Sequence, residues 1–257
     1  MNETPDPMLS LLGRPDGPLA GASLWALEVA STHLLTPRMR RVELTGPNLG
    51  DLAHQPGQDL MMRIPSGDGT VNRRYTIRRV DRAAGLVTID AVVHGDGQGS
   101  QWFANAVPGD RIDAIGPRGK IVVAGEHVPG GIAGDESALP AMLAMAEAVP
   151  VGSRAVVLAE VADERDEQPV GSAAMDLRWL HRGIVAPGRS TVLVDALADV
   201  ALLDGPGHVY LAGESSSVAA MRRTLLGRGV PAESISAKAY WSLGRANAAH
   251  GEPERMS

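Results

Sequence analysis

The sequence contains no cysteine, and only 3% of its 257 residues are aromatic. The absence of cysteine excludes disulfides, thiolate zinc sites and iron–sulfur clusters held by this chain. Any redox chemistry therefore needs a bound organic cofactor or another metal. Because Phe, Tyr and Trp are so few, the core must be built from aliphatic residues and methionine.

Long apolar runs and a broad excess of positive charge are also missing. No stretch approaches the roughly 18 apolar residues of a membrane-spanning helix, so we expect no membrane insertion. The net charge of −6 argues against a nucleic-acid partner, since a duplex binder needs a basic face. Residues 1–22 lack a basic start followed by an apolar block, which predicts a loose N-terminal segment and a cytoplasmic protein. The sequence does not indicate the oligomeric state, and a monomer is the default expectation.

Residues 23–125 predict a domain of short β-strands separated by Gly, Pro, Asn and Asp turns, which is typical of a barrel. The expected strands are Leu24–Ala30, Met39–Thr45, Gln58–Ile64, Arg73–Val80, Leu86–Val93, Arg111–Ile115 and Lys120–Ala124. A short helix is expected at Gly99–Ala106.

Residues 126–257 predict strands that alternate with helices, which indicates a parallel sheet covered on both faces. The expected strands are Arg154–Val161, Thr191–Val194, His208–Ala212 and Ser234–Trp241, and the expected helices are Ala138–Ala148 and Ser215–Gly227. The first strand of this domain, Pro129–Ala133, is unusual because proline and paired glycines weaken a strand.

The most informative segment is the strand Arg73–Arg79, which spends four of its seven positions on arginine. Arg73 and Tyr75 share one face of this strand. Guanidinium groups suit phosphate oxygens, and a tyrosine ring can lie against a flat heterocycle. A solvated edge strand protected by its charge is the alternative interpretation.

Three further segments combine glycine with short polar residues at predicted helix starts, where backbone N–H groups favour anions. They are His94–Trp102, Gly134–Ala141 and Leu211–Ser217. The second and third follow predicted strands of the α/β domain, and dinucleotides bind at the carboxyl ends of such strands. A mobile glycine loop and ordinary helix capping by Asp135 or Ser137 remain open as alternatives.

Taken together, the motifs resemble the siderophore-interacting protein family of flavin-dependent ferric-siderophore reductases. The resemblance rests on Pro37–Val42, Arg73–Arg78, Val92–Gly97, Gly99–Trp102, Pro108–Asp110, Gly116–Gly119, Gly134–Pro140, Trp179–Arg182, Ala212–Glu214 and Tyr240–Gly244. It implies a ferredoxin-reductase-like fold, with a six-stranded antiparallel FAD-binding barrel followed by a parallel-sheet NAD(P)H-binding domain. The resemblance is incomplete at Ala239 and Ser242, where the family tends to have glycine and a basic residue.

The resemblance also implies roles for individual residues. Arg73 would meet the FAD phosphates, Tyr75 would lie along the isoalloxazine, and Thr76 would hydrogen-bond near its reactive nitrogen, which makes Tyr75 and Thr76 the catalytic candidates. The other implied cofactor contacts are Arg78, Val93, His94, Gly99, Ser100, Trp102 and Trp241. Those implied for the nicotinamide nucleotide are Gly134, Asp135, Glu136, Ser137, Gly213 and Glu214.

The implied activity passes electrons from NADPH or NADH through FAD to a ferric siderophore. A flavin suits this task because the nicotinamide gives two electrons together and ferric iron accepts one. Candidate basic anchors for an anionic chelate are Arg40, Arg118, Lys238 and Arg245. The seven histidines show no ligand spacing, so we expect no metal site held by the protein itself.

Three other functions remain open at this point. The chain would fit a general flavin reductase that uses a protein electron acceptor, or a siderophore-binding module without nucleotide turnover. It would fit less well a hydrolase built on Gly213–Ser217, which matches the G-x-S-x-G nucleophile pattern in part. Its partners would be drawn from His181, His208 and Asp195.

Overall fold

The computed structural model describes residues 21–67, 69–93, 95, 97–119, 121–123, 129–150, 153–170, 175–200 and 207–244. The chain divides into two compact units. The first comprises Met1–His33 and Arg40–Lys120, and the second comprises Leu34–Met39 and Ile121–Ser257. No helix among the described residues is long and apolar enough to cross a membrane.

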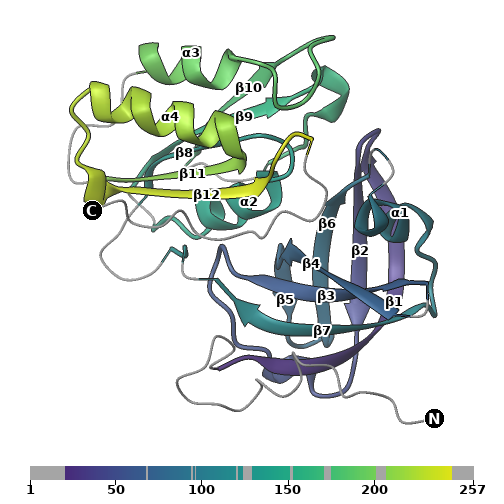
Figure 1. Ribbon diagram of the computed structural model, residues 1–257. Helices are drawn as coiled ribbons and strands as arrows, with labels where there is room; N and C mark the ends of the chain where they lie inside the picture. Colours follow the sequence, from purple (N-terminus) through teal and green to yellow (C-terminus); the bar gives the residue numbers. More distant parts are fainter. Residues whose placement is uncertain are drawn as a thin grey trace. The chain divides into compact units, whose positions relative to one another are not determined.

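The first unit is a seven-stranded antiparallel sheet with the order β4-β3-β7-β1-β2-β6-β5. Its strands are β1 (Ser23–Thr36), β2 (Met39–Thr45), β3 (Asp59–Ser66), β4 (Gly69–Thr76), β5 (Arg79–Asp81), β6 (Leu86–Val92) and β7 (Arg111–Arg118). One short helix, α1 (Gln98–Asn105), follows β6 (Figure 1). A single turn of 3₁₀ helix, η2, spans Leu49–Asp51.

The sheet closes on itself at Ile77 and Arg78. These two residues join β4 to β5, which are the two outermost strands of the sheet order. The backbone N–H of Ile77 donates to Gln58 O before β3, and that of Arg78 donates to Thr88 O of β6. The predicted strand Arg73–Val80 is therefore divided between two strands. The sheet has seven strands, where the resemblance implied six.

The barrel core is aliphatic, as the composition predicted. Buried Leu, Ile, Val and Met side chains from the strands surround the single phenylalanine, Phe103 of α1, which has no exposed surface. The predicted strand Lys120–Ala124 is not found over 121–123, and its two ends lie outside the described residues.

The second unit contains a five-stranded sheet of order β10-β9-β8-β11-β12, in which every neighbouring pair is parallel. Its strands are β8 (Pro129–Gly134), β9 (Ala155–Val161), β10 (Met175–His181), β11 (His208–Glu214) and β12 (Ile235–Trp241). Its helices are α2 (Leu139–Glu147), α3 (Val192–Asp199) and α4 (Ser215–Gly227), with the short 3₁₀ turns η3 (Glu164–Asp166) and η4 (Ala232–Ser234).

Helices cover both faces of this sheet. Helices α3 and α4 lie on one face and α2 on the other (Figure 1). Leu193 and Leu197 of α3 pack in one cluster with Met221 and Leu225 of α4 and with Ala133 of β8. From the centre of the sheet, β8, β9 and β10 follow one another toward one edge, while β11 and β12 follow toward the other edge. The topological switch point therefore falls between β8 and β11. Ligands bind at such a point, beyond the carboxyl ends of the strands.

The structure of this unit differs from the sequence prediction in two places. Thr191–Val194 is not a strand but the start of α3, because Leu193 and Leu197 bury one helical face and Thr191 Oγ1 donates to Asp195 Oδ2 at 2.8 Å. Strand β10 was not expected at all. Its alternation is weak, with Leu177 and Leu180 half-buried at the sheet edge.

The unusual first strand of the α/β domain does form. β8 occupies the centre of the sheet and pairs with both β9 and β11. Its glycines allow close packing: a Cβ on Gly134 would lie 2.4 Å from Ala212 O and 2.9 Å from Ala138 Cβ. Glycine therefore brings α2 and β11 close to this strand, at the cost of intrinsic strand propensity.

Candidate functional site

The barrel brings Arg73, Tyr75 and Gly99 together. Arg73 and Tyr75 are on the same face of β4, and Gly99 lies in the first turn of α1. A Cβ on Gly99 would lie 2.4 Å from the Tyr75 hydroxyl oxygen and 3.3 Å from Arg73 Cγ. The helix start thus lies directly against the two side chains that sequence analysis singled out.

Tyr75 is held by an aromatic cluster. Its ring centroid lies 4.3 Å from that of Phe103, which in turn makes an edge contact with Trp102 at 4.9 Å. Burial raises the pKa of the Tyr75 phenol, against the opposing effect of the Arg73 charge. The hydroxyl is therefore protonated at neutral pH and can donate a hydrogen bond.

Two of the other strand arginines form ion pairs with buried carboxylates. Arg74 makes a bidentate pair with Asp59, with nitrogen–oxygen distances of 2.8 and 2.6 Å. Arg78 Nε lies 3.8 Å from Asp90 Oδ2, and Arg41 binds the same carboxylate through both of its oxygens at 2.7 Å. These partners give Arg74 and Arg78 a structural role, so a cofactor contact by Arg78 stays a prediction.

The remaining predicted flavin contacts lie close to this group in the chain. Thr76 is buried at the end of β4, while Val93, Ser100 and Trp102 are half-buried around α1. His94 lies outside the described residues. The start of α1 carries no side-chain cap, because its N-cap residue is Gly97. A guanidinium, a phenol and uncapped helix N–H groups fit a cofactor that has both phosphates and a flat ring.

In the second unit, Asp135 connects the ends of three strands. Its Oδ1 accepts from Ser137 N at 2.9 Å and from Ser137 Oγ, and its Oδ2 accepts from Glu214 N at 2.8 Å and Trp241 Nε1 at 2.9 Å. Gly213 makes this possible, since a Cβ there would lie 2.6 Å from Asp135 Oδ2 and its φ is +135°. Five of the predicted residues therefore lie together: Asp135, Ser137, Gly213, Glu214 and Trp241. The Asp135 carboxylate, however, already accepts its hydrogen bonds from other residues of the protein.

Glu214 caps the first turn of α4. Its side chain accepts from Ser216 N at 2.6 Å, Ser217 N at 3.0 Å and Leu243 N at 3.1 Å. Although burial opposes it, these hydrogen bonds lower the pKa of Glu214 to about 2. The carboxylate thus takes the position at the helix start that a nucleotide phosphate would otherwise take.

Glu136, Arg182 and Glu160 form a buried ionic group at the carboxyl edge of β8 and β9. Arg182 donates to both oxygens of Glu136 at 2.6 and 2.7 Å and lies 3.8 Å from Glu160. Burial and the nearby Asp135 charge raise the pKa of Glu136, although Arg182 opposes the shift. The same two causes, against the pull of Arg182, raise the pKa of Glu160 to about 7.

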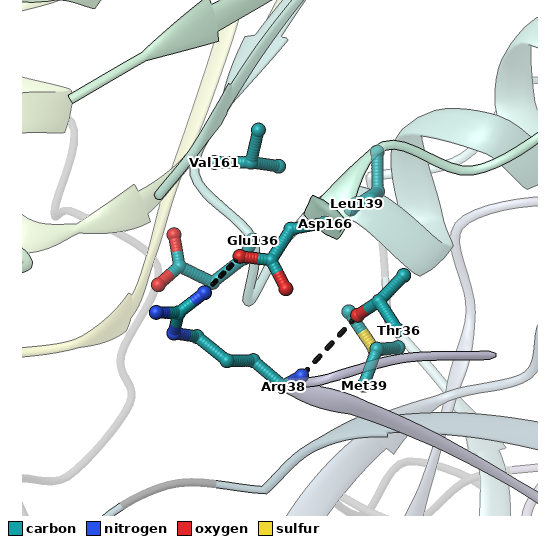
Figure 2. A pocket seen from close by; sticks show the side chains of 7 residues that line it. All are labelled: Thr36, Arg38, Met39, Glu136, Leu139, Val161 and Asp166. Carbon is teal, nitrogen blue, oxygen red and sulfur yellow. Dashed lines mark hydrogen bonds and ion pairs between the residues drawn. The ribbon is translucent and has the colours of Figure 1, made fainter. Parts of the chain in front are cut away.

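A cavity opens beside this ionic group within the second unit. It has about 10 Å³ of free space, close to the size of one water molecule. It is lined by Thr36, Arg38, Met39, Glu136, Leu139, Val161 and Asp166 (Figure 2). Arg38 forms an ion pair with Asp166 Oδ2 and lies 3.7 Å from Asp163 Oδ2. The other oxygen of Asp166, Oδ1, is buried and accepts no hydrogen bond from any described residue.

Stability should fall with rising pH because of Glu160. Its pKa is about 7 in the folded protein against an ordinary value of 4.5, so folding takes up a proton between these two pH values. We expect the free energy of unfolding to decrease across this window by up to about 1.4 kcal/mol per pH unit. Urea unfolding at pH 5, 6, 7 and 8 measures this slope. The measurement at pH 8 lies above the range from 4.5 to about 7 in which folding takes up the proton.

Replacing Glu160 by Gln should flatten the dependence of the unfolding free energy on pH and stabilise the protein above pH 7. Glu233→Gln is the control, because it changes an exposed carboxylate of η4 and should leave the slope unchanged. A wild-type slope that survives Glu160→Gln would assign the proton uptake to another group.

The predicted substrate anchors are divided between the two units. In the first unit, Arg40 Nη1 donates to Thr32 Oγ1 at 3.1 Å and Arg118 Nη1 lies 3.1 Å from Met61 Sδ. In the second unit, Lys238 is buried with its ammonium 5.2 Å from the Tyr240 ring centroid. Arg245 lies outside the described residues. Siderophore contacts by these four residues stay predictions.

The hydrolase alternative finds no support in the described part of the chain. Ser215 Oγ donates to Glu214 at 3.0 Å, His181 contacts Glu167 and His208 contacts Ser236, each at 2.8 Å. The proposed nucleophile and its bases therefore have other partners. Among the described residues, no group of three or more His, Asp and Glu side chains could hold a metal ion.

Sequence reasoning missed the use of several charged residues in the two units. Arg182 stood in the segment Trp179–Arg182, but its pairing with Glu136 was not expected. Glu160 carried a usable signal, because it is a charged residue near the end of an otherwise apolar strand. Asp59 and Asp90 carried none, since their pairing with arginines depends on which strands become neighbours and in which register.

The two units define the class of protein. A barrel followed by a five-stranded parallel sheet gives a ferredoxin-reductase-like fold, shared with the ferredoxin reductase in carbazole 1,9a-dioxygenase (TM-score 0.72, 22% identity, 86% of this chain and 70% of that one). A model of the siderophore-interacting FAD-binding domain matches residues 55–121, and a model of the siderophore-interacting protein matches residues 131–244. The chain belongs to the siderophore-interacting protein family.

Two individual relatives agree with this assignment. The siderophore utilization protein from T. fusca has a crystal structure that matches with a TM-score of 0.83 and 32% identity, covering 90% of this chain and 97% of that one. The ferric vibriobactin reductase ViuB of Vibrio cholerae is 32% identical over 90% of this chain and 93% of its own length.

Proposed function

We propose that this protein is a reductase that passes electrons from NAD(P)H through FAD to a ferric siderophore. Each NAD(P)H gives two electrons and leaves as NAD(P)⁺ with one proton, so two ferric ions become ferrous. When bound, the flavin supplies the conversion of a two-electron donor into single electrons. Ferrous iron binds hard oxygen ligands less tightly than ferric iron, so the metal is released from the chelate. NAD(P)H as donor also favours a cytoplasmic location.

The observation that carries this proposal is the contact of Gly99 with Arg73 and Tyr75. The lack of a side chain at Gly99 lets Tyr75 and Arg73 lie directly against the start of α1. Backbone N–H groups at a helix start favour a phosphate, and Arg73 supplies charge beside them. In this proposal Arg73 binds the phosphates, while Tyr75 and Thr76 orient the ring from the end of β4. In the second unit, Asp135 and Glu214 act as positioning residues, because their oxygens already accept hydrogen bonds from the protein.

The first test concerns the cofactor. Protein purified with added FAD should retain the yellow absorbance of a flavoprotein, and rapid mixing with NADH or NADPH under anaerobic conditions should bleach it. A ferric siderophore added next should restore the colour while ferrous iron is trapped by a chelator. A flavin that binds but is reduced by neither donor would identify a binding module instead, and reoxidation by a protein acceptor alone would identify a general reductase.

The double change Arg73→Ala and Tyr75→Ala should weaken FAD binding by about a hundredfold, because it removes one charge-assisted contact and one stacking contact. Equilibrium titration of the apoprotein, followed by flavin fluorescence, measures this. Arg111→Ala is a suitable control, since Arg111 is an exposed arginine on another strand of the same barrel and its ion pair is with Glu28. FAD affinity that is equal in the two variants would contradict the roles of Arg73 and Tyr75.

A further inference from the structure

The segment that follows β9 in the second unit bears on the choice between NADH and NADPH. This inference rests on the proposed reductase function. In doubly wound sheets an acidic side chain, about 20 residues beyond the first strand–helix turn, hydrogen-bonds the ribose 2′-hydroxyl of NAD. An arginine in that region accommodates the 2′-phosphate of NADP. Here the chain leaves the carboxyl edge at Gly134, runs through α2 and next returns to that edge at the end of β9.

The segment that follows β9 is acidic. Residues 162–166 read Ala-Asp-Glu-Arg-Asp, with Asp163 as the N-cap of η3 and Glu164 exposed. Asp166 Oδ1 is buried and accepts no hydrogen bond from the described residues, although it borders the cavity beside Val161 (Figure 2). A buried carboxylate oxygen without a donor is costly unless a donor arrives. A ribose hydroxyl is such a donor, whereas a phosphate at neutral pH has mainly acceptors.

The arginines at this edge are already paired. Arg165 makes a bidentate pair with Asp163, with both nitrogen–oxygen distances at 2.8 Å. Arg182 is bidentate on Glu136, and Arg38 is paired with Asp166. A 2′-phosphate carries close to two negative charges, and at this position it would meet carboxylates and guanidinium groups whose charge is already compensated.

We propose that the protein selects NADH over NADPH, because Asp163, Glu164 and Asp166 face the 2′ position of the adenosine ribose and hold the neighbouring arginines in ion pairs. Asp163 has the largest part in this selection. It repels a phosphate directly, and it also removes Arg165 as a phosphate ligand.

Calorimetric titration of the full chain with ADP-ribose and with 2′-phospho-ADP-ribose tests the proposal without any redox step. The wild type should bind ADP-ribose at least about tenfold more tightly, the size of one charge-assisted hydrogen bond. In Asp163→Ser the serine oxygen can still accept from Arg165 N, which Asp163 does at 3.1 Å, while the guanidinium is released. The affinity ratio should then shift toward the phosphorylated ligand by about tenfold or more. Glu164→Gln, which leaves Asp163 in place, should shift the ratio in the same direction by a few-fold.

The chain offers a matched control. Asp176 pairs with Arg178 two residues further on, as Asp163 does with Arg165, and the distance from Arg178 Nη2 to Asp176 Oδ2 is 2.9 Å. This pair stands at the start of β10, the amino edge of the parallel sheet, away from the ligand edge. Asp176→Ser should therefore release an arginine without changing the affinity ratio.

The proposal is overturned if the wild type binds 2′-phospho-ADP-ribose as tightly as ADP-ribose or binds neither. It is also overturned if Asp163→Ser and Asp176→Ser shift the ratio equally. Stopped-flow reduction of the flavin by NADH and NADPH separates this from the reductase proposal. Failure of both donors to reduce the flavin would remove the reductase function, while the affinity ratio would still decide the nucleotide preference.

Discussion

Gly99→Ala should weaken FAD binding by about tenfold or more, although it adds a single methyl group. The new Cβ would lie 2.4 Å from the Tyr75 hydroxyl oxygen, so the tyrosine ring has to move. That ring packs against Phe103 in the barrel core and has little room to shift. Overpacking of this kind costs about 1–3 kcal/mol in stability, and the displaced ring also leaves its position toward the flavin. Titration of the apoprotein with FAD and thermal melting measure the two effects.

Gly97→Ala is the matched control for this change. Gly97 lies two residues away, its φ is −64°, and a Cβ there would have no heavy atom within 4 Å. FAD affinity and melting temperature should remain those of the wild type. A second variant, Gly99→Ala with Tyr75→Phe, removes the oxygen that the methyl group meets and should recover much of the stability. If Gly99→Ala binds FAD like Gly97→Ala, the contact of α1 with Tyr75 has no part in the cofactor site.

The two units differ in how far their sequence predicted them. In the barrel, turn residues marked most strand boundaries, because glycine, proline and asparagine act locally. The break after Thr76 was not predictable, since β-branched and charged residues continue through it. Ile77 and Arg78 leave the strand because their N–H groups bond to opposite sides of the closing sheet. Barrel closure is a property of the whole sheet, and a local pattern does not contain it.

The α/β unit shows a second limit. Val192, Leu193 and Val194 read locally as a strand, but Leu197 completes a helical stripe that packs against α4. Tertiary packing overrode the propensity of the valines. At the site, the motif residues from Gly134 to Ser137 and from Gly213 to Ser217 were found from their glycines and short polar side chains. The hydrogen bonds that these residues make were not predicted. Only the fold shows that Asp135 accepts from the backbone of Glu214 and that Glu214 accepts from the backbone of Leu243.

The acidic character of the carboxyl edge explains why the single buried arginine there matters. Asp135, Glu136 and Glu160 are each less than a tenth exposed, and Arg182 is the buried cation among them in the described residues. Burial, and then the charge of Asp135, raise the pKa of both Glu136 and Glu160 even with Arg182 present. The start of α2 and the end of β9 therefore depend on this guanidinium for their relative position.

Arg182→Met should accordingly be the most destabilising of the changes considered. Removing one partner of a buried pair leaves an uncompensated charge and costs about 3–5 kcal/mol. Urea unfolding at pH 7 measures this, and ADP-ribose affinity should fall in parallel because the edge of the sheet is loosened. Adding Glu136→Gln to Arg182→Met removes the stranded charge, so the double variant should recover at least half of the lost stability.

Arg178→Met provides the comparison, since it also removes an arginine that pairs with a carboxylate in this unit. Arg178 and Asp176 are largely exposed, with 48% and 39% of their side-chain surface accessible, so water already screens the pair and stability should barely change. Equal losses in the Arg178 and Arg182 variants would mean that burial of the Glu136 pair has no energetic consequence. A double variant that is no more stable than Arg182→Met would show that the guanidinium acts through packing, because neutralising Glu136 would then have relieved nothing.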